Sequence, residues 1–294
     1  MSYASDSNQS QPSGLTSSDI TQRLTAHLKA LTGPRDPYLG EGSHQLAQQY
    51  IRSELNRWGT AQSQSFYVKQ REHFNWQLTI TGRRPQLAPI LIGAHYDTVP
   101  GSPGADDNAS GVAVMLLLAE LFSQTRPRRT IHFIAFDLEE YGLVGSSHCA
   151  QLWRSQARPL HLMLSLEMLG YFTNGPQQYP LDLLGKIYPS QGNFIALIGN
   201  ASALLKMTAM KRHLHKAGAA CQWLPVVNQG RQIPATRRSD HAPFWDAGYS
   251  AIMVTDTADL RNPHYHQPSD TLRTLNIDRM AQITIGLYKS LSRF

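Results

Sequence analysis

Cysteine is scarce in this sequence, and no apolar run is long. The chain contains two cysteines, Cys149 and Cys221, which excludes a disulfide-rich scaffold and a cysteine-rich zinc module. The apolar stretch at residues 112–118 falls far short of the roughly 18 residues that a membrane-spanning helix requires. We therefore expect neither a transmembrane segment nor a membrane partner.

Charged residues are also few, and the excess positive charge is dispersed. The charged fraction is 16% and the apolar fraction 41%, which is typical of a folded globular protein and excludes a disordered, collagen-like or coiled-coil chain. The net charge of +6 is spread along the chain without a clustered stripe or a reader motif, so we expect no nucleic-acid partner. The densest basic groups are small: Arg126/Arg128/Arg129, Lys211/Arg212 and Arg237/Arg238.

The first residues differ in composition from the rest of the chain. Residues 1–14 are rich in Ser, Gln and Asn and have neither the basic region nor the apolar region of a signal peptide. We interpret them as a disordered tail and expect a cytoplasmic protein. No repeat or linker divides residues 15–294, which predicts one domain over that range.

Helix and strand patterns alternate along the chain. Ser17 or Ser18 is placed to cap a first helix, and a second helix is expected at about 43–58 with Leu46, Tyr50 and Leu55 on its apolar side. The alternating segments 64–70 and 74–81 predict an antiparallel hairpin. The remaining pattern predicts an α/β fold with a mostly parallel central sheet. Further strands are expected at 88–94, 130–136, 162–166, 194–198 and 251–254, and further helices at 109–122, 143–153, 201–217 and 277–291.

Ionisable residues follow nearly every predicted strand. In open α/β sheets, functional groups gather at the carboxyl ends of the strands. One such residue alone is ordinarily a helix cap or a solvated side chain. Several at one end of a sheet form a negative cluster that requires cations, and mixed imidazole and carboxylate ligands suit Zn²⁺. The residues are His95, Asp97, Asp106, Asp107, Glu139, Glu140, Glu167, His264 and His266.

Five sequence blocks in order resemble the M28 family of zinc peptidases. They are His95-Tyr96-Asp97, residues 104–111 (GADDNASG), Glu139-Glu140-x-Gly142, Ser239-Asp240-His241 and residues 262–266 (NPHYH). The resemblance extends from about residue 43 to the C-terminus. It implies a three-layer α/β/α fold of the zinc-exopeptidase, phosphorylase/hydrolase-like type and a co-catalytic centre with two Zn²⁺ ions per chain.

The resemblance implies a ligand set for these two ions. Asp107 matches the carboxylate that bridges both metals. His95 and Glu167 would complete one metal site, and Glu140 and His266 would complete the other. Asp106 is then expected to cap the helix that follows it.

The resemblance also implies roles next to the metals. Glu139 matches the general base that takes a proton from the attacking water. Asp97 would accept a hydrogen bond from His95 and fix its tautomer. Asp240 is expected to have a similar orienting or substrate-side role.

Two further residues, and one difference from the pattern of the family, concern the binding of substrate. Tyr265 stands next to the implied ligand His266, where some members of the family use a Tyr hydroxyl to stabilise an oxyanion. Arg238, just before the block at 239–241, is a candidate to hold a substrate carbonyl. Many family aminopeptidases have Asp where this chain has Glu167. Because Glu is one methylene longer, we expect the difference to affect specificity more than the metal site.

The resulting functional prediction is a zinc-dependent aminopeptidase that acts on peptides with a free N-terminus. Glutaminyl cyclase, which shares the fold, binds one zinc and forms pyroglutamate, is the alternative. Its members usually have Trp where this chain has Tyr265. A third possibility is a binding module without metals. Segments 173–193 and 222–237 are rich in Pro, Gly and Gln and are expected to shape the pocket.

Overall fold

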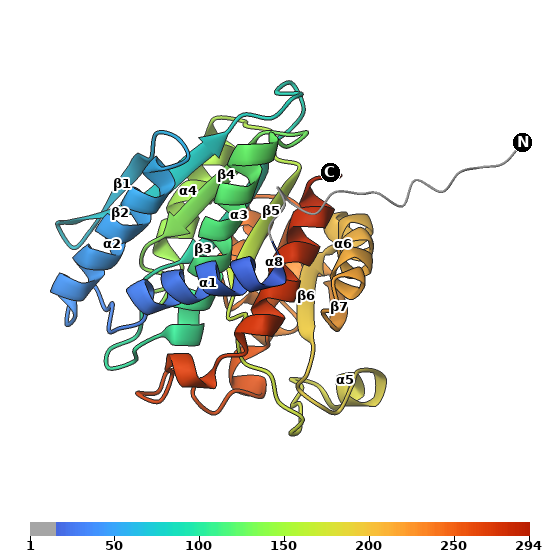
Figure 1. Ribbon diagram of the computed structural model, residues 1–294. Coiled ribbons are helices and arrows are strands. Elements are labelled where there is room, and N and C mark those ends of the chain that lie inside the picture. Colours follow the sequence, from blue (N-terminus) through green and yellow to red (C-terminus); the bar gives the residue numbers. More distant parts are fainter. Residues whose placement is uncertain (1–15) are drawn as a thin grey trace, which may run out of the picture.

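Eight strands form one continuous sheet in the computed structural model, which describes residues 16–294 (Figure 1). The predicted tail at residues 1–14 lies outside the described residues. The strand order across the sheet is β1-β2-β4-β3-β5-β8-β6-β7. The strands are β1 (Gln62–Val68), β2 (Arg71–Ile80), β3 (Ile90–His95), β4 (Ile131–Phe136), β5 (Leu162–Glu167), β6 (Ile195–Asn200), β7 (Cys221–Val226) and β8 (Ala251–Thr255).

The centre of the sheet is parallel and its margins are mixed. β4, β3, β5 and β8 pair in parallel, and every residue of these four strands is buried. Strands covered on both faces by helices have this continuous apolar character, which explains why they were recognisable in the sequence. β2 pairs antiparallel with β4, and β6 pairs antiparallel with β8. The predicted mixed α/β sheet is therefore confirmed.

Helices cover both faces of the sheet and complete three layers. One apolar core lies between the sheet and the first, second, third, sixth and eighth helices, and a smaller core packs Trp153 and Trp245 against the other face. Figure 1 shows several helices of the larger layer in front of the sheet. The helices are α1 (Ser17–Leu31), α2 (Glu41–Asn56), α3 (Gly111–Thr125), α4 (Val144–Ser155), α5 (Asp182–Ile187), α6 (Leu204–Lys216), α7 (His241–Asp246) and α8 (Ile277–Leu291).

Two local details differ from the prediction at the start of the chain. The cap of α1 is Thr16, whose hydroxyl accepts from the Asp19 N–H while the Asp19 carboxylate accepts from the Thr16 N–H, so neither Ser17 nor Ser18 is the cap. The hairpin turn consists of Lys69 and Gln70, with φ of 47° and 66°, although both were predicted to belong to the first strand at 64–70. Positive φ at both central residues is the geometry of a two-residue hairpin turn.

The apolar face of α2 was predicted only in part, because Leu55 is buried and Tyr50 packs against the core as expected, but Leu46 does not. Leu46 is 64% exposed, whereas His44, Ala47 and Ile51 are buried. Nε2 of the buried His44 imidazole donates a hydrogen bond to the Asp137 carboxylate at 2.8 Å, which compensates for placing a polar side chain inside. The apolar residues Ala47, Ile51 and Leu55 on the same side of the helix pack into the main core.

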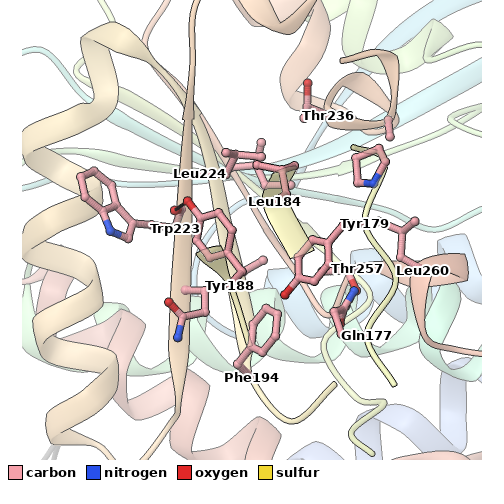
Figure 2. Close-up of a pocket in the computed structure, with 15 residues that line it drawn as sticks. Gln177, Tyr179, Leu184, Tyr188, Phe194, Trp223, Leu224, Thr236, Thr257 and Leu260 are labelled. Carbon is pink, nitrogen blue, oxygen red and sulfur yellow. Dashed lines mark hydrogen bonds between the residues drawn. The ribbon is translucent and has the colours of Figure 1, made fainter. Parts of the chain in front are cut away.

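One face of the edge formed by β6 and β7 is covered by the short helix α5 and by loops. Ile195, Leu197 and Cys221 pack in the core with α6 and α8, whereas Ile198 and Leu224 point to the opposite face. That opposite face is lined by residues from segments 177–194 and 235–236 (Figure 2). β7 and α7 were missed by the sequence prediction. Pro225 within β7 obscures the strand pattern and is tolerated because β7 is an edge strand.

A buried arginine ties α1 to the loop that leads to the site. The Arg35 guanidinium donates to the backbone carbonyls of Tyr96, Gly33 and Gly104 at 2.8, 2.9 and 2.8 Å. It also donates to Pro103 O at 2.9 Å. Because these are backbone acceptors, Arg35 fixes the course of the chain at both ends of the loop at residues 96–104.

Replacing Arg35 by Met is expected to destabilise the protein by at least about 3 kcal/mol, because each buried polar group left without a partner costs about 1–3 kcal/mol. Urea unfolding followed by circular dichroism measures the difference. Lys29→Met, an exposed position on α1, is the control and is expected to have almost no effect. An Arg35→Met variant as stable as this control would contradict the role of Arg35 in holding the loop.

Candidate active site

Most of the predicted site residues meet at one edge of the sheet, where the parallel strands end. His95 and Glu167 are the last residues of β3 and β5, and Glu139 and Glu140 are the third and fourth residues after the end of β4. The irregular turn at Ala105–Ser110 brings in Asp107 between β3 and α3. His266 comes from the segment after β8 and lies beside Asp107.

Asp107 occupies the centre of this group. Its Oδ1 lies 3.2 Å from Nε2 of His95, and its Oδ2 lies 3.2 Å from Nε2 of His266. Each carboxylate oxygen therefore faces a different imidazole. Gly104 permits this loop, because its φ is 57° and a Cβ there would lie 2.3 Å from the Asp107 carbonyl oxygen.

Two sets of side chains are spaced as metal ligands. His95, Glu139 and Glu167 form one set, and Asp107, Glu140 and His266 form the other, with ligand atoms in each set within 4.8 Å of one another. The pairing of His95 with Glu167 and of Glu140 with His266 agrees with the predicted sites. Glu139, for which we predicted a catalytic role, lies close enough to His95 and Glu167 to be grouped with them.

The electrostatics of the site favour a bound cation. Burial and the Asp107 charge raise the pKa of Glu140 to about 7. Burial lowers the pKa of His266, but its contacts with Asp107 and Glu140 outweigh this and raise the pKa to about 10. The pKa of His95 is likewise raised despite burial, chiefly by Glu139 and Glu167. The carboxylates thus attract positive charge onto the imidazoles, and divalent cations would supply the same charge.

Unpartnered atoms at the site point to the same conclusion. Nε2 of His266, Oε1 of Glu140 and both carboxylate oxygens of Asp240 are buried without a hydrogen bond in standard geometry. Buried polar atoms ordinarily have a partner. Imidazole nitrogen and carboxylate oxygen are the donor set of zinc sites, so these residues fit the implied metal.

Asp97 connects the two halves of the site. Its carboxylate accepts from the backbone N–H groups of Glu139 and Glu140, both at 3.1 Å. Nδ1 of His95 lies 3.2 Å from the Asp97 carbonyl oxygen and 3.4 Å from its Oδ1. His95 Nδ1 thus hydrogen-bonds to the backbone carbonyl of Asp97 with the carboxylate slightly farther away, while that carboxylate holds the turn that carries both glutamates.

Several supporting residues were not identified from the sequence. Asp270 accepts from the N–H groups of Asp106 and Asp107 at 2.9 and 3.1 Å, and the Ser239 hydroxyl donates to Glu167 at 2.7 Å. Both residues lie in or beside sequence blocks that resemble the M28 family. The block at residues 239–241 includes Ser239 but does not show which contact it makes, and Asp270 lies four residues after the last block.

The predicted capping role of Asp106 is wrong. Its carboxylate accepts from the Gly170 N–H at 2.8 Å and from the Asn262 amide at 2.9 Å, and it is fully buried. The first residue of α3, Gly111, instead donates to the side chain of Asn108 at 3.0 Å. The irregular backbone at residues 105–110 turns the Asp106 side chain away from α3. The carboxylate instead links the loop after β5, which contains Gly170, to the loop that contains Asn262 and His266.

A second buried cluster, missed by the sequence analysis, lies just before Glu139. His44 and His73 contact the two carboxylate oxygens of Asp137 at 2.8 and 3.0 Å. Burial raises the pKa of Asp137, but the two imidazoles outweigh it and lower the pKa to about 2. The Asp137 N–H donates to the amide oxygen of Asn75 at 3.1 Å. These contacts fix the end of β4, and thereby the start of the turn that carries Glu139 and Glu140.

Tyr265 and Arg238 line one cleft together with Glu167, one of the candidate metal ligands. The Tyr265 ring stacks on His266 with 3.7 Å between ring centroids. Arg238 donates to the Tyr265 hydroxyl at 3.0 Å and to Asp259 at 2.9 Å. Glu167, Arg238, Tyr265 and Asp259 line one cleft, so both predicted substrate contacts face the same space.

Asp240 is buried next to the first ligand set. Burial raises its pKa to about 7, with His95 opposing the shift and Glu167 and Asp97 adding to it. The Ser146 hydroxyl also lowers this pKa. Asp240 therefore contributes negative charge behind His95 and Glu167 rather than lining the open cleft. The predicted orienting role fits this position better than direct contact with substrate.

A three-layer α/β/α sandwich with imidazoles and carboxylates around a shared aspartate is the arrangement of a metallohydrolase. The sequence model of peptidase family M28 matches residues 75–289, and the chain belongs to this family.

Curated relatives include aminopeptidases. The chain is 38% identical to the protein YfbL of Escherichia coli over 67% of its own length and 64% of that protein. It is 28% identical to the aminopeptidase YwaD of Bacillus subtilis over 69% of its length and 41% of that protein. It is 30% identical to the probable lipoprotein aminopeptidase LpqL of Mycobacterium tuberculosis, over 65% and 39%. The chain thus spans about two fifths to two thirds of these relatives.

Solved structures confirm the fold. The LapA aminopeptidase of Legionella pneumophila superposes with a TM-score of 0.69 at 20% identity, covering 94% of this chain and 71% of that one. The glutaminyl cyclase of Porphyromonas gingivalis gives 0.67 at 18% identity, covering 95% and 98%. The predicted family and fold are therefore confirmed, and the fold alone does not separate the two activities.

The helices of residues 16–294 include none that combines the length and the apolar character needed to cross a membrane. The cytoplasmic location stays a prediction, and so does the absence of a nucleic-acid partner.

Proposed function

We propose that this protein is a zinc-dependent aminopeptidase that removes residues from peptides with a free N-terminus. The observation that carries the proposal is the position of Asp107, with one oxygen toward His95 and the other toward His266. A hydrolase of peptidase type is the activity common to the named relatives YwaD and LpqL. The single domain predicted over residues 15–294 is part of this proposal, and the continuous sheet supports it.

Five residues would hold two Zn²⁺ ions in this proposal. His95 and Glu167 would serve one ion, Glu140 and His266 the other, and Asp107 both. When bound, the ions would lower the pKa of the attacking water and polarise the scissile carbonyl. The chain itself supplies the shape of the site. Asp97 orients His95, Ser239 holds Glu167, and Asp270 holds the backbone of Asp107.

Glu139 is the proposed general base. Burial raises its pKa well above the usual range and Glu167 adds to the shift, while His95 opposes it. Its backbone is fixed by Asp97, which places the carboxylate beside the proposed ligands. Glu139 would take the proton of the attacking water and deliver it to the leaving amine. Tyr265, held by Arg238, is the proposed donor to the developing oxyanion.

The acidic surroundings favour a substrate with a positive amino group. Glu167 lies at the inner end of the cleft, and Glu139 and Asp240 lie behind it. A substrate α-ammonium in this region would be stabilised by the carboxylates in a poorly hydrated site. An acetylated amine has no such charge and is excluded by the same groups.

A peptide with a free N-terminus is therefore expected to be shortened one residue at a time, whereas its N-acetylated form is expected to remain intact. Mass spectrometry of the two peptides, incubated with the zinc-loaded protein, measures this directly. A chelator is expected to abolish the cleavage. Equal cleavage of both peptides, or products from internal bonds, would exclude the aminopeptidase proposal.

The same experiment tests glutaminyl cyclase, which the structural similarity to the Porphyromonas gingivalis enzyme keeps as the second candidate. A peptide that begins with Gln would then lose ammonia, about 17 Da, without losing a residue. One metal ion per chain would accompany this result, because two-metal activation of water is not needed for cyclisation. A chain that binds no metal would instead favour the binding module.

A further inference from the structure

Arginine is concentrated at the end of the sheet opposite the candidate active site. The loop between β2 and β3 contains Arg83 and Arg84, and the loop between α3 and β4 contains Arg126, Arg128 and Arg129. Figure 1 shows the first of these loops at the top of the molecule. The parallel strands β3 and β4 run from these loops toward the proposed ligands, a distance of about 16 Å along either strand. The arginines therefore do not belong to the site already described.

The two loops are fixed against each other by their backbones. The N–H groups of Arg83 and Arg84 donate to the carbonyls of Pro127 and Arg128 at 2.8 and 2.9 Å. Gly82 is required for this close approach, because a Cβ there would lie 2.3 Å from a backbone carbon of the facing loop. The arginine side chains thus extend from a backbone that is already ordered, which reduces the entropy that is lost when a ligand binds.

Three of the arginines are without a partner in the described part of the chain. The side chains of Arg83, Arg84 and Arg126 are exposed, and among residues 16–294 none of the three forms a hydrogen bond or an ion pair. The two loops, residues 81–89 and 123–130, contain no Asp or Glu. No carboxylate side chain of these loops therefore compensates for their positive charge.

Neighbouring groups add to this charge. Arg128 and Arg129 share the oxygen of Phe294, at 3.3 and 2.6 Å. Burial and three nearby cations, among which Arg129 has the largest effect, lower the pKa of His161 to about 4. Burial and Arg129 also lower the pKa of Lys206. Because like charges disfavour one another's charged forms, an anion bound at these loops would relieve the repulsion.

Arg83, Arg84 and Arg128 line an open hollow between the two loops, which we call the arginine hollow. A guanidinium group presents its N–H donors in a planar fork that matches two oxygens of a phosphate group. One carboxylate has two oxygens and engages one such fork. An anion with several phosphate groups has enough oxygens for all three arginines.

We propose that the arginine hollow binds a small soluble anion that carries two or more phosphate groups. The proposal does not depend on the proposed aminopeptidase function, because its residues lie at the other end of the sheet. It predicts a second ligand for this protein, recognised by arginine side chains and independent of peptide binding.

Calorimetry with inorganic tripolyphosphate on the zinc-loaded protein measures this binding. We expect one tripolyphosphate per chain. The double variant Arg83→Ser with Arg84→Ser is expected to weaken binding by about tenfold or more, because charge-assisted hydrogen bonds to phosphate are among the strong ones. Both side chains are exposed, so the fold is expected to be retained, and thermal unfolding checks this. Zinc content is measured before and after each titration, since tripolyphosphate also binds metal ions.

The adjacent basic residues Lys211 and Arg212 on α6 provide the matched control. Lys211→Ser with Arg212→Ser removes the same charge from another part of the surface and is expected to leave tripolyphosphate binding unchanged. Equal weakening in the two double variants would show attraction by net charge alone, and it would overturn the arginine hollow as a site. Absence of tripolyphosphate binding to the wild type would overturn it as well.

Two other ligands test the assigned chemistry. Hexaglutamate is expected to bind at least about tenfold more weakly than tripolyphosphate, because its carboxylates match the guanidinium forks one at a time. Tighter binding of hexaglutamate, lost in the variant of Arg83 and Arg84, would replace the proposal by docking of an acidic peptide. Phosphatidylglycerol vesicles are expected not to cosediment with the protein. Binding to these vesicles without binding to tripolyphosphate would assign the arginines to a membrane surface and overturn the proposal.

Discussion

Asp107→Ala is expected to lose both metal ions, whereas replacing any other proposed ligand removes mainly one. The reason is geometric, because Asp107 faces His95 with one oxygen and His266 with the other. Without it, each half of the site retains one imidazole and one or two carboxylates, too few for tight binding of zinc. Elemental analysis of the purified variant gives the zinc content per chain directly.

Two further variants make this result interpretable. Asp107→Asn preserves the shape of the side chain, so a folded Asn variant that lacks zinc would show that the charge and not the packing is needed. Asp259→Ala removes a carboxylate that is 45% exposed and paired with Arg238, and it is expected to keep both ions. Full zinc occupancy in a folded Asp107→Ala protein would contradict the bridging assignment.

The centre of the fold could be predicted because burial on both faces leaves a strong pattern. Strands β3, β4, β5 and β8 are buried throughout and appear in the sequence as uninterrupted apolar runs. The rule that functional groups gather at the carboxyl ends of parallel strands then brought the predicted ligands together. The resemblance to the M28 family supplied the roles that position alone does not give.

The elements at the margins of the fold could not be predicted fully, because their positions depend on contacts between segments that are far apart in the sequence. β7 contains Pro225, which is permitted only because the strand lies at the edge of the sheet. The spacing of Ala47, Ile51 and Leu55 marks the buried face of α2. His44 lies on the same face although it is polar, and its partner Asp137 is 93 residues away in the sequence.

Asp106 illustrates the same limit within the site. Two aspartates and an asparagine before a helix ordinarily suggest a cap. Here the cap contact comes from Asn108, and Asp106 joins Gly170 to Asn262. The choice among three adjacent polar residues depends on the backbone path at residues 105–110, and that path depends on Asp270 and Arg35 from other parts of the chain.

Glu139→Gln is expected to keep both zinc ions and the fold while lowering kcat by about 10²- to 10⁴-fold, the usual contribution of a positioned general base. The amide has almost the same shape as the carboxylate but cannot take a proton. The backbone N–H of Glu139 still donates to Asp97, so the position of the side chain is retained. Single-turnover kinetics on a free N-terminal peptide, with zinc content measured on the same sample, test both parts of this expectation.

Comparison with a variant of the adjacent residue, Glu140, shows whether Glu139 acts as a general base or as a metal ligand. Glu140 contacts His266 at 3.2 Å and is a proposed ligand, so Glu140→Gln is expected to lose activity together with part of the zinc. Glu139 also lies within the first ligand set, which makes the comparison decisive. If Glu139 were a ligand, Glu139→Gln would lose zinc as well. If it were neither ligand nor base, the variant would retain both its zinc and near wild-type kcat, as expected for the exposed control Glu72→Gln.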